Sequence, residues 1–514
     1  MSVSKVSNVS NVSSAPSTVN AIEETKNLEE FSPNYEFVNT REMTIKDFFN
    51  TLFVQFGHYR ATQRIPRLDG LNETQRKILW AAIKKKYKNK EKLTDVMSDV
   101  NKISNYHHGP ASLANVLNNL IAPYKNGLAF LRPDGAFGSR STRSAAAERY
   151  TQTRNNQFLE LMFPEEDITA THGYRSIDGK PAEPLTLYPI LPLGIINGQS
   201  QTSVGFATEL LPRDPKVILD LFVGILKGIV TSIPGHLTPK WPLCECNVNL
   251  TGPNSWETRG VVKKGNKGKK KFIEILEVPH NWDGSKLVSV LDALQDSGDI
   301  ESFIDATNGD KFSTIIYSSK FYDLPEETIV EKLGLTSTVK ESFVYINMDS
   351  RFITDCKTIA SYINYFIQER IKIYEARRTY RLAKCIFDLN KTVVVINYIN
   401  EVIAGRIEIR NKSEEEVIKQ LEAYPDTYSF KPMSKTFVYL DPALAAYSKV
   451  DLNYDYLFDF TVRNFTPKRI EVLQERWKKI HAEYIAIESK TAAGIWLEDL
   501  EEFDKIMLKY GWNK

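Results

Sequence analysis

Apolar residues recur at spacings of three and four along two long stretches, a period typical of helices with one packed face. Residues 357–390 contain neither Pro nor Gly, so they predict one long helix. A second long helix is expected from Thr466, with Pro467 in its first turn. Because the two helices flank about 70 residues, they predict an antiparallel coiled-coil arm with a small globular tip. The predicted seam of the second helix consists of Ile470, Leu473, Trp477, Ile480, Tyr484 and Ile487.

Shorter patterns mark the rest of the chain. Apolar residues between 48 and 56 recur at helical spacing and predict an amphipathic helix. Residues 93–120 resolve into two short helices joined by the turn YHHGP, which predicts a helix-turn-helix. Its second helix, roughly Ala111 to Leu120, is the one that such a motif presents to DNA. Residues 240–350 contain the strand-like runs FIEILEV and FSTIIYS, which indicate a mixed segment of helices and strands.

Positive charge is concentrated in one segment. The whole chain of 514 residues carries a formal net charge of only +2. Residues 60–102 contain twelve Lys or Arg and five Asp or Glu, which gives 12 − 5 = +7. A duplex-binding face needs such a local excess of cations, although a solvated lysine-rich helix would show the same composition. The charge therefore favours a local nucleic-acid surface and excludes a uniformly basic protein.

Composition excludes several other classes of protein. The content of 42% hydrophobic and 25% charged residues is typical of a globular chain with several domains. No apolar run approaches the ~18 residues of a membrane span, and the N-terminus lacks the apolar core of a secretory signal. Free thiols in a reducing cytoplasm are expected, because the four cysteines are too few for a disulfide framework or a zinc site. These are Cys244, Cys246, Cys356 and Cys385.

Four motifs follow one another in the chain. RIPRLDGLNETQRKILW comes first, then NYHHGPASL, then GAFGSRSTRSAAAERYT, and finally PILPLGIINGQSQTSVGFATELLP. Together with the C-terminal YDYLFDF and IWLEDL, they resemble the breakage–rejoining region of type IIA DNA topoisomerases, including the A subunits of gyrase and topoisomerase IV. The resemblance runs from about residue 45 to 505. Any one motif is weak, but their order and spacing are specific.

The resemblance implies a catalytic tyrosine. Tyr150, in AAAERYT, matches the residue that attacks a DNA phosphorus, forms a 5′-phosphotyrosyl ester and releases a 3′-hydroxyl. Since a phenol ordinarily has a pKa of ~10, it needs help at neutral pH. The resemblance gives Arg149 the role of stabilising charge on the phosphate, and His108 a proton-relay or 3′-side role. Arg64 is the nearest match to a second active-site arginine.

The resemblance is imperfect at three places. Only two residues separate IP from DGL where relatives have three, so Arg60 or Arg67 remains an alternative to Arg64. Asn72 stands where relatives often have Lys, and Gln201 where they usually have Gly. The resemblance also implies DNA contacts by a further group of residues. Within this group, either Ile190 or Leu191 would wedge between base pairs. This group consists of Arg76, Lys77, His107, Arg140, Arg143, Ile190 and Leu191.

The resemblance implies a multidomain α+β fold. We expect a winged-helix (helix-turn-helix) DNA-cleavage domain, an α/β tower domain, and a long antiparallel coiled-coil arm that ends in a small helical C-gate. A low-complexity N-terminal tail is expected to be disordered, with a short partner-binding arm as the alternative. The predicted boundaries are 1–40 for the tail, 41–175 for the winged-helix domain with the active tyrosine, 176–350 for the tower, 351–395 and 464–490 for the arm, 396–463 for the C-gate dimerisation domain, and 491–514 for a C-terminal segment.

The resemblance also implies what must come from outside the chain. The sequence contains neither E-G-D-S nor D-x-D, the motifs of the family's metal-binding module, and no phosphate-binding loop. Mg²⁺ is therefore expected to be bound by a partner subunit, which would also hydrolyse ATP. The layout resembles the medium subunit of a T4-like bacteriophage topoisomerase, which relaxes or decatenates double-stranded DNA as a heterotetramer or larger complex. Two copies would meet at the C-gate, in the cytoplasm of a host.

Two other functions fit parts of the sequence. Tyrosine recombinases also use Arg, His and Tyr, but their tyrosine normally lies near the C-terminus, whereas Tyr150 comes early and precedes a coiled-coil arm. A catalytically silent DNA-bending protein of the same fold is the second alternative. The intact pair Arg149–Tyr150, together with His108, argues against it.

Overall fold

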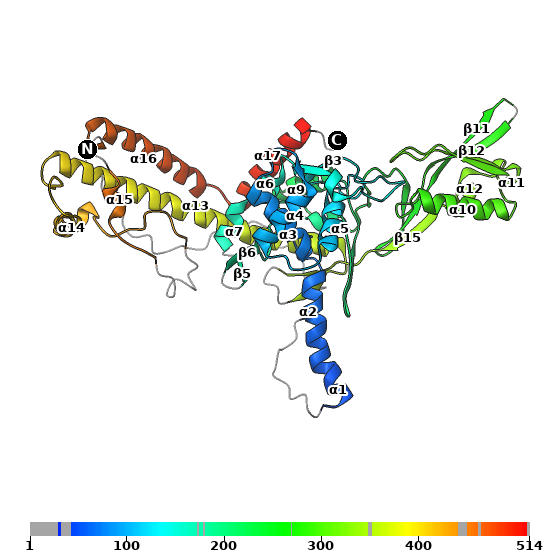
Figure 1. Cartoon of the computed structure of the whole chain (residues 1–514), viewed down its shortest axis with the longest axis horizontal. Coiled ribbons are helices and arrows are strands. Elements are labelled where there is room, and N and C mark those ends of the chain that lie inside the picture. The colour runs from blue at the N-terminus through cyan, green and yellow to red at the C-terminus, as the bar shows by residue number, and fades with distance from the viewer. Residues whose placement is uncertain are drawn as a thin grey trace.

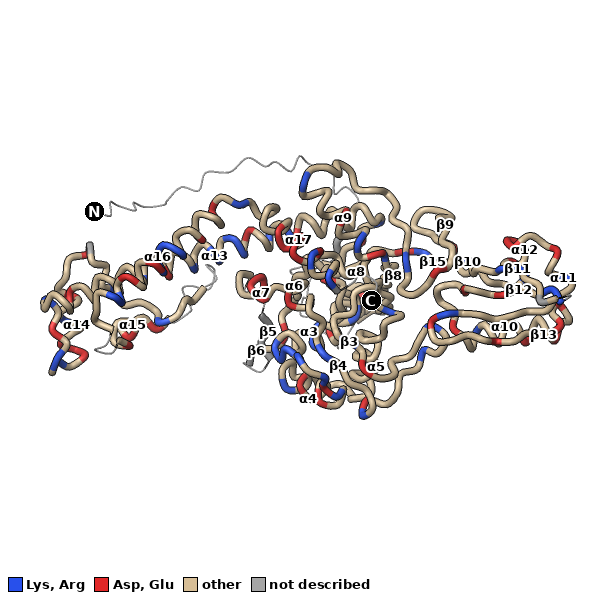
Figure 2. Tube along the Cα trace, turned by 90° about the horizontal axis from the view of Figure 1, so that it is seen from above, with Lys and Arg blue, Asp and Glu red and all other residues tan. Residues whose placement is uncertain are grey.

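A central body carries two arms and one projecting helix in the computed structural model (Figure 1). Lys and Arg are mixed with Asp and Glu along both arms (Figure 2). The structure describes residues 29–31, 43–171, 174–177, 180–268, 270–347, 352–439, 450–460 and 464–510. In these ranges, no helix has both the length and the apolar character that a membrane crossing requires.

The central body contains the predicted helix-turn-helix. Asn72 caps α3 reciprocally with Gln75, which fixes where this helix begins. The helices α3, α4 and α5 pack around one apolar core, and a three-stranded antiparallel sheet in the order β2-β4-β3 forms the wing. The bounds are α3 Glu73–Lys85, β2 Glu91–Lys92, α4 Leu93–Ser104, α5 Pro110–Ile121, β3 Leu131–Asp134, η2 Glu148–Tyr150 and β4 Gln152–Asn155.

The strip that follows the wing also belongs to the central body. Its apolar residues between 187 and 222 share the core of the helix-turn-helix, while the tower has a core of its own. The predicted tower boundary at residue 176 is therefore placed too early, because the Pro- and Gly-punctuated strip packs inward. The elements are α6 Leu159–Met162, α7 Glu165–Thr171, β5 Tyr174–Ile177, β6 Lys180–Pro184, α8 Leu193–Ile196, β7 Gln199–Thr202, β8 Ala207–Leu210 and α9 Pro215–Leu226.

The tower consists of two antiparallel sheets with helices packed against them. The strand orders are β15-β10-β9 and β11-β12-β14-β13. Both strand-like runs of the sequence are strands, and Gly268 in the tip of the β11–β12 hairpin has φ +66°. The elements are β9 Asn247–Gly252, β10 Ser255–Arg259, β11 Val261–Lys267, β12 Lys270–Glu277, α10 Gly284–Asp296, β13 Ser302–Asp305, β14 Thr314–Tyr317, α11 Ser319–Tyr322, α12 Glu326–Lys332 and β15 Thr336–Lys340.

The other arm is built on α13, a single helix of 45 residues, Ile359–Ile403. Its first half packs in the central core and its second half in the core of the tip, so one helix joins both regions. The helix α16, Pro467–Glu488, lies along α13, and its predicted seam is confirmed because all six residues are buried or half-buried. The tip contains α14 Glu414–Glu422, η3 Asp426–Tyr428 and α15 Asp455–Phe458.

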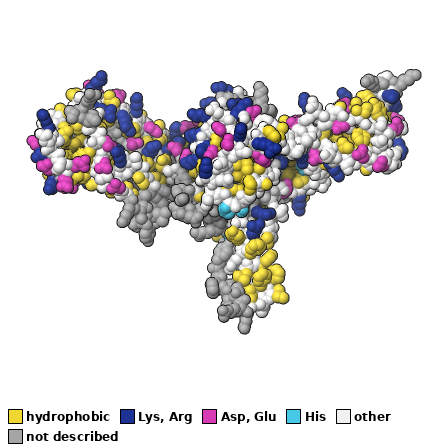
Figure 3. Space-filling view, in the orientation of Figure 1, with side chains coloured by type: hydrophobic (Ala, Val, Ile, Leu, Met, Phe, Trp, Pro, Cys, Tyr) yellow, Lys and Arg dark blue, Asp and Glu magenta, His cyan; other side chains and the backbone are white. Residues whose placement is uncertain are grey.

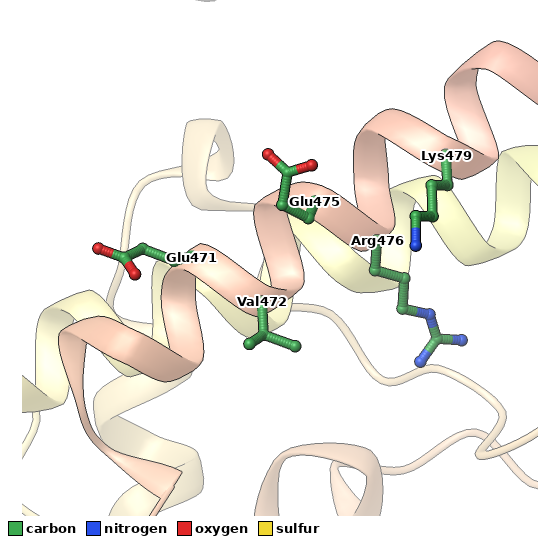
Figure 4. A pocket seen from close by; sticks show the side chains of 5 residues that line it. All are labelled: Glu471, Val472, Glu475, Arg476 and Lys479. Atoms are coloured by element: carbon green, nitrogen blue, oxygen red, sulfur yellow. The ribbon is translucent and has the colours of Figure 1, made fainter.

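The outer surface of α16 is charged. A hollow of about 500 Å³ is lined by Glu471, Val472, Glu475, Arg476 and Lys479, all from this one helix (Figure 4). None of them is a predicted site residue. After the arm, α17 (Ala492–Tyr510) returns the chain to the central core.

The N-terminal region differs from the prediction. Glu29–Phe31 forms strand β1, paired antiparallel with β17 (Ile353–Asp355), so the expected disorder through residue 40 is wrong for these three residues. The rest of the predicted tail lies outside the described residues. The strand β17 also pairs with β16, Val344–Ile346. The projecting helix consists of α1 Ile45–Phe48, the π-helical segment η1 Phe49–Phe53 and α2 Val54–Arg64.

Candidate active site

A polar hollow of about 470 Å³ lies where the projecting helix meets the central body. We call it the basic pocket. The residues that line it come from α2, α3, α5, β7 and the segments before α3 and α5, so elements distant in sequence converge here. Arg64, Lys77 and His108 are thus brought together as predicted site residues. The lining consists of Arg60, Gln63, Arg64, Asn72, Glu73, Thr74, Lys77, His108, Ser112 and Gln201.

The arginines of the basic pocket differ in environment from its lysine. Arg64 is exposed, and Arg60 is half-buried with Nη1 donating to Gln63 Oε1 at 3.1 Å. Lys77 is buried and its Nζ lies 2.9 Å from Glu183 Oε1. A guanidinium at the rim of a polar hollow suits an incoming phosphate, with which it forms charge-assisted hydrogen bonds. Arg67, an alternative for the role of Arg64, is buried.

The turn between α4 and α5 presents both histidines to solvent. Asn105 ends α4 with φ +47°, and Gly109 precedes α5. His107 Nδ1 lies 3.2 Å from the carbonyl oxygen of Asn105, and its ring centroid is 4.8 Å from that of His108. The neighbouring Tyr106 is buried and anchors the turn. Histidine side chains surface in the central body beside the base of the projecting helix (Figure 3).

Tyr150 ends the short helical turn η2 and is 69% exposed. The guanidinium carbon of Arg149 lies 4.7 Å from the centre of its ring, a cation–π distance. The backbone behind it is tightly held, since a side chain on Gly135 would come within 3.3 Å of the Tyr150 carbonyl oxygen. Gly135 has φ +108°, which favours glycine. Tyr150 does not line the basic pocket.

Hydrogen bonds connect the Tyr150 loop, residues 135–150, with the tower. Arg143 Nη2 donates to the carbonyl oxygens of Trp282 at 2.8 Å and His280 at 3.3 Å. Burial first, and then the nearby cations Arg143 and Arg140, lower the pKa of His280 to about 4. The ring of His280 stacks on Trp241 with centroids 4.1 Å apart. The loop that carries the tyrosine is therefore attached to the tower.

A metal would have few ligands in the described part of the chain. No group of three or more His, Cys, Asp or Glu side chains is placed there to hold one. The basic pocket contains a single carboxylate, that of Glu73. These residues do not fit Mg²⁺, which prefers carboxylate oxygens.

Comparison with known proteins gives the family. Residues 64–501 match the family model for the A subunit of DNA gyrase/topoisomerase IV. The chain belongs to this family. It is 25% identical over 482 residues to "DNA topoisomerase 2, mitochondrial" of Dictyostelium discoideum, which covers 91% of this chain and 36% of that protein. "Putative DNA topoisomerase 2, mitochondrial" of Caenorhabditis elegans is 26% identical over 489 residues, covering 92% and 40%.

A solved structure shows the same fold. The crystal structure of the Plasmodium falciparum topoisomerase II DNA-binding, cleavage and re-ligation domain superposes with a TM-score of 0.76 at 22% identity. The match covers 92% of this chain and 66% of that one. The predicted multidomain α+β architecture is therefore confirmed. The chain spans 36% and 40% of the length of the two curated relatives above. The activity of those whole proteins can therefore only be proposed for this chain.

In this family member, Arg76 is buried and paired with a carboxylate. Its Nε and Nη2 donate to both carboxylate oxygens of Asp69, at 2.8 and 3.0 Å, and Nη2 also reaches the Leu71 carbonyl oxygen. Asp69 in turn accepts from the backbone N–H groups of Leu71 and Leu187. The predicted DNA contact of Arg76 does not fit this geometry, because the guanidinium is buried and paired. Lys77 is buried as well, although it reaches the pocket wall.

Three further predicted contacts are also buried. Arg140 Nη1 lies 2.5 Å from Glu277 Oε1, and Arg140 thereby ties the Tyr150 loop to the tower. Ile190 and Leu191 are fully buried in the central core, and the Ile190 carbonyl oxygen accepts from Trp496 Nε1 at 3.0 Å. A wedge must reach solvent to enter DNA, so the structure does not support this role for either residue.

Sequence reasoning missed several polar residues of the basic pocket. Gln63, Thr74 and Ser112 line it without having been predicted, and Gln201 was noted only as a departure from the family pattern. One signal was present, since Ser112 is the serine of the motif NYHHGPASL that follows the two histidines. The others needed the folded arrangement, because α2 and β7 are separated by more than one hundred residues of sequence.

Proposed function

We propose that the chain is the DNA cleavage and religation subunit of an ATP-dependent type IIA topoisomerase. Tyr150 is the nucleophile. Its phenolic oxygen bonds to a backbone phosphorus, the bond from that phosphorus to the 3′-oxygen breaks, and the released 3′-hydroxyl later reverses the step. The exposed pair Arg149–Tyr150 carries this proposal, because a nucleophile that attacks duplex DNA must be accessible and must have a cation beside it.

The basic pocket gives the other half of the proposed site. Arg64, with Arg60 one turn before it on α2, binds a phosphate oxygen, and His108, which also lines the pocket, accepts or returns a proton. Since Tyr150 does not line this pocket, we infer that DNA and a second copy of the chain join the two halves. Two copies are required in any case, because a double-strand break needs two tyrosines. The α13–α16 arm and its tip would form the exit gate between them.

A partner subunit completes the proposed enzyme. It would bind Mg²⁺, which stabilises the leaving oxygen when present, and it would hydrolyse ATP. The layout favours the medium subunit of a T4-like bacteriophage topoisomerase, working in the cytoplasm of its host to relax or decatenate DNA.

The deciding experiment is a cleavage assay on supercoiled plasmid with Mg²⁺ and the partner, stopped with detergent. Wild type should leave linear DNA with protein on its 5′ ends, and Tyr150→Phe should leave none while binding DNA normally. Tyr322→Phe on the tower is the matched control and should cleave like wild type. Equal cleavage by wild type and Tyr150→Phe would refute the nucleophile. DNA binding and bending without cleavage by either would favour a silent architectural protein.

A further inference from the structure

Two of the four cysteines lie two residues apart, directly before the first strand of the tower. Cys244 and Cys246 precede β9, and their thiols form a hydrogen bond with each other. Cys244 is 6% exposed and Cys246 is half-buried. The neighbouring Leu243 and Glu245 are exposed, so this segment lies at the surface. We call the pair the dithiol. The proposed cleavage step uses neither of its thiols.

A bond between the two sulfur atoms is within reach of this segment. Two residues of chain span at most about 7 Å, even when they are fully extended. Disulfides join residues whose Cα atoms are about 4.4–6.8 Å apart. Cys244 and Cys246 can therefore form a disulfide after a small contraction of the backbone between them.

Cys244 is the more reactive of the two thiols. The hydrogen bond from Cys246 lowers the pKa of the Cys244 thiol, burial opposes this effect, and the nearby cation of Arg140 adds to it. The same hydrogen bond and burial raise the pKa of Cys246. Since the thiolate is the form that attacks an oxidant, Cys244 is the expected nucleophile and Cys246 the thiol that completes the disulfide.

Hydrogen peroxide supplies an oxidant of the required class. The Cys244 thiolate attacks one oxygen, the O–O bond breaks, and a sulfenic acid forms while hydroxide leaves and takes up the proton that Cys244 had lost. The sulfur of Cys246 then attacks the Cys244 sulfur. The S–S bond forms, the S–O bond breaks, and the leaving oxygen takes the Cys246 proton to become water. Two electrons pass from the thiols to the peroxide, which becomes two molecules of water.

The backbone on both sides of Cys244 holds a buried ion pair in place. The Leu243 carbonyl oxygen accepts from Arg140 Nη1 at 3.2 Å, and the Glu245 N–H donates to Glu277 Oε2 at 2.9 Å. Arg140 and Glu277 are themselves paired, and this pair attaches the Tyr150 loop to the tower. Leu243 has φ +55°, which is uncommon for a residue other than glycine and persists only where the surroundings enforce it.

Closing the disulfide disturbs this arrangement. The new ring contains the whole backbone of Glu245, so the ring and not Glu277 then sets the direction of the Glu245 N–H. A buried charged group that loses a hydrogen-bond partner is strongly destabilised. We propose that Cys244 and Cys246 form a peroxide-sensitive dithiol, whose oxidation to a disulfide loosens the attachment of the Tyr150 loop to the tower. This site goes beyond the proposed function, and only its consequence for DNA cleavage rests on that function.

The first test counts thiols in the intact chain, without DNA or partner. Wild type has four cysteines, so four thiols should react in denaturant before treatment with hydrogen peroxide and two after it. Mass spectrometry of the alkylated peptides should place the disulfide between residues 244 and 246. Cys246→Ser should form no disulfide. Cys385→Ser is the matched control, because Cys385 is also 6% exposed but lies on α13, and this variant should form the disulfide like wild type.

The second test measures the attachment of the loop by hydrogen exchange. The N–H of Arg140 donates to Asp310 Oδ1 at 2.7 Å, and the N–H of Ser141 donates to the Gly309 carbonyl oxygen, both in the tower. These two amides should exchange about 10-fold faster or more in oxidised wild type, the factor that corresponds to one lost hydrogen bond to a charged group. Dithiothreitol should restore the original rate, and peroxide should not change it in Cys246→Ser.

Three results would overturn the inference. The first is wild type that keeps four reactive thiols after peroxide, and the second is a disulfide that joins two chains on a non-reducing gel. The third is an oxidised wild type in which residues 244 and 246 are bonded while the two loop amides exchange as before. Because oxidised and reduced wild type can be compared directly, the test stands even where a variant fails to fold.

The inference and the proposed function fail in different ways. Thiol counts and amide exchange are measured on the chain alone, so they do not depend on whether Tyr150 attacks DNA. If Tyr150→Phe cleaves like wild type but the disulfide forms and the loop loosens, the cleavage function is wrong and the dithiol stands. If Tyr150 forms the covalent adduct but no disulfide forms, the function stands and the dithiol is wrong.

Discussion

The cations beneath the basic pocket and those at its rim come from the same family motifs but have opposite environments. Arg76 and Lys77 are 3% exposed and paired with Asp69 and Glu183. Arg64 at the rim is exposed, as is Arg149 beside Tyr150. A buried, paired cation holds the backbone in place, whereas an exposed one is accessible to a phosphate. A count of basic residues therefore overestimates the number of cations that are accessible to DNA.

The largest effect is expected beneath the pocket, from Asp69→Ala. The substitution leaves the Arg76 guanidinium buried without its carboxylate, which destabilises a fold by about 3–5 kcal/mol. Denaturant unfolding of the whole chain measures the change. Asp220→Ala is the control, because that carboxylate pairs with Lys216 in solvent and contributes about 1 kcal/mol or less. Similar losses in the free energy of unfolding for both variants would contradict the distinction between buried, paired side chains and exposed ones.

The exposed cation beside Tyr150 should change chemistry and leave stability alone. Arg149→Ala is expected to slow formation of the covalent adduct by about 100- to 1000-fold, the usual consequence of losing one group that stabilises transition-state charge. Its unfolding curve should match wild type, since Arg149 is exposed. The adduct rate is measured at saturating 5′-labelled duplex with partner and Mg²⁺. If the rate is normal and only DNA affinity falls, Arg149 contributes to binding and not to the transition state.

The junction between the Tyr150 loop and the tower should respond to pH. Folding lowers the pKa of His280 from 6.5 to about 4, so the unfolded chain binds more protons in this window. Stability should therefore fall as the pH drops from 6.5 to 4, by about 1–3 kcal/mol once partial exposure is considered. His280→Gln keeps a polar partner for Thr258 and should show a shallower fall. Identical pH profiles in melting experiments would argue against this assignment.

Features set by local sequence were predicted well. The seam of α16 was predicted from its own periodicity, and its six residues are buried or half-buried. The ordered motifs identified the family and, with it, the architecture. In each case the determining contacts lie within one element or its immediate neighbours.

Features set by distant partners were not predictable from the sequence pattern. The motif around Ile190 predicts a DNA contact, but Trp496, about three hundred residues later, donates to the Ile190 carbonyl oxygen and closes the core over it. The sequence likewise predicts a phosphate contact for Arg140, whereas in the structure Arg140 pairs with Glu277 on β12. That Tyr150 does not line the basic pocket was likewise not predictable. A single chain without aligned relatives carries no signal for such pairs.

The smallest effect concerns a single phosphate contact at the rim. Arg64→Ala should weaken duplex binding only a few-fold, yet it should reduce the slope of log K against log salt by about 1, since each neutralised phosphate contributes about 0.9. Anisotropy titrations between 50 and 200 mM salt, roughly the range over which such slopes are resolved, measure it. Lys372→Ala on α13 is the control, because this exposed lysine pairs with Glu369 and does not line the pocket, and its slope should equal wild type. If the slope is unchanged for Arg64→Ala but reduced for Arg60→Ala, the phosphate contact belongs to Arg60, one turn earlier on α2. This result would decide which arginine matches the second active-site arginine of the family, a choice that the shortened motif leaves open.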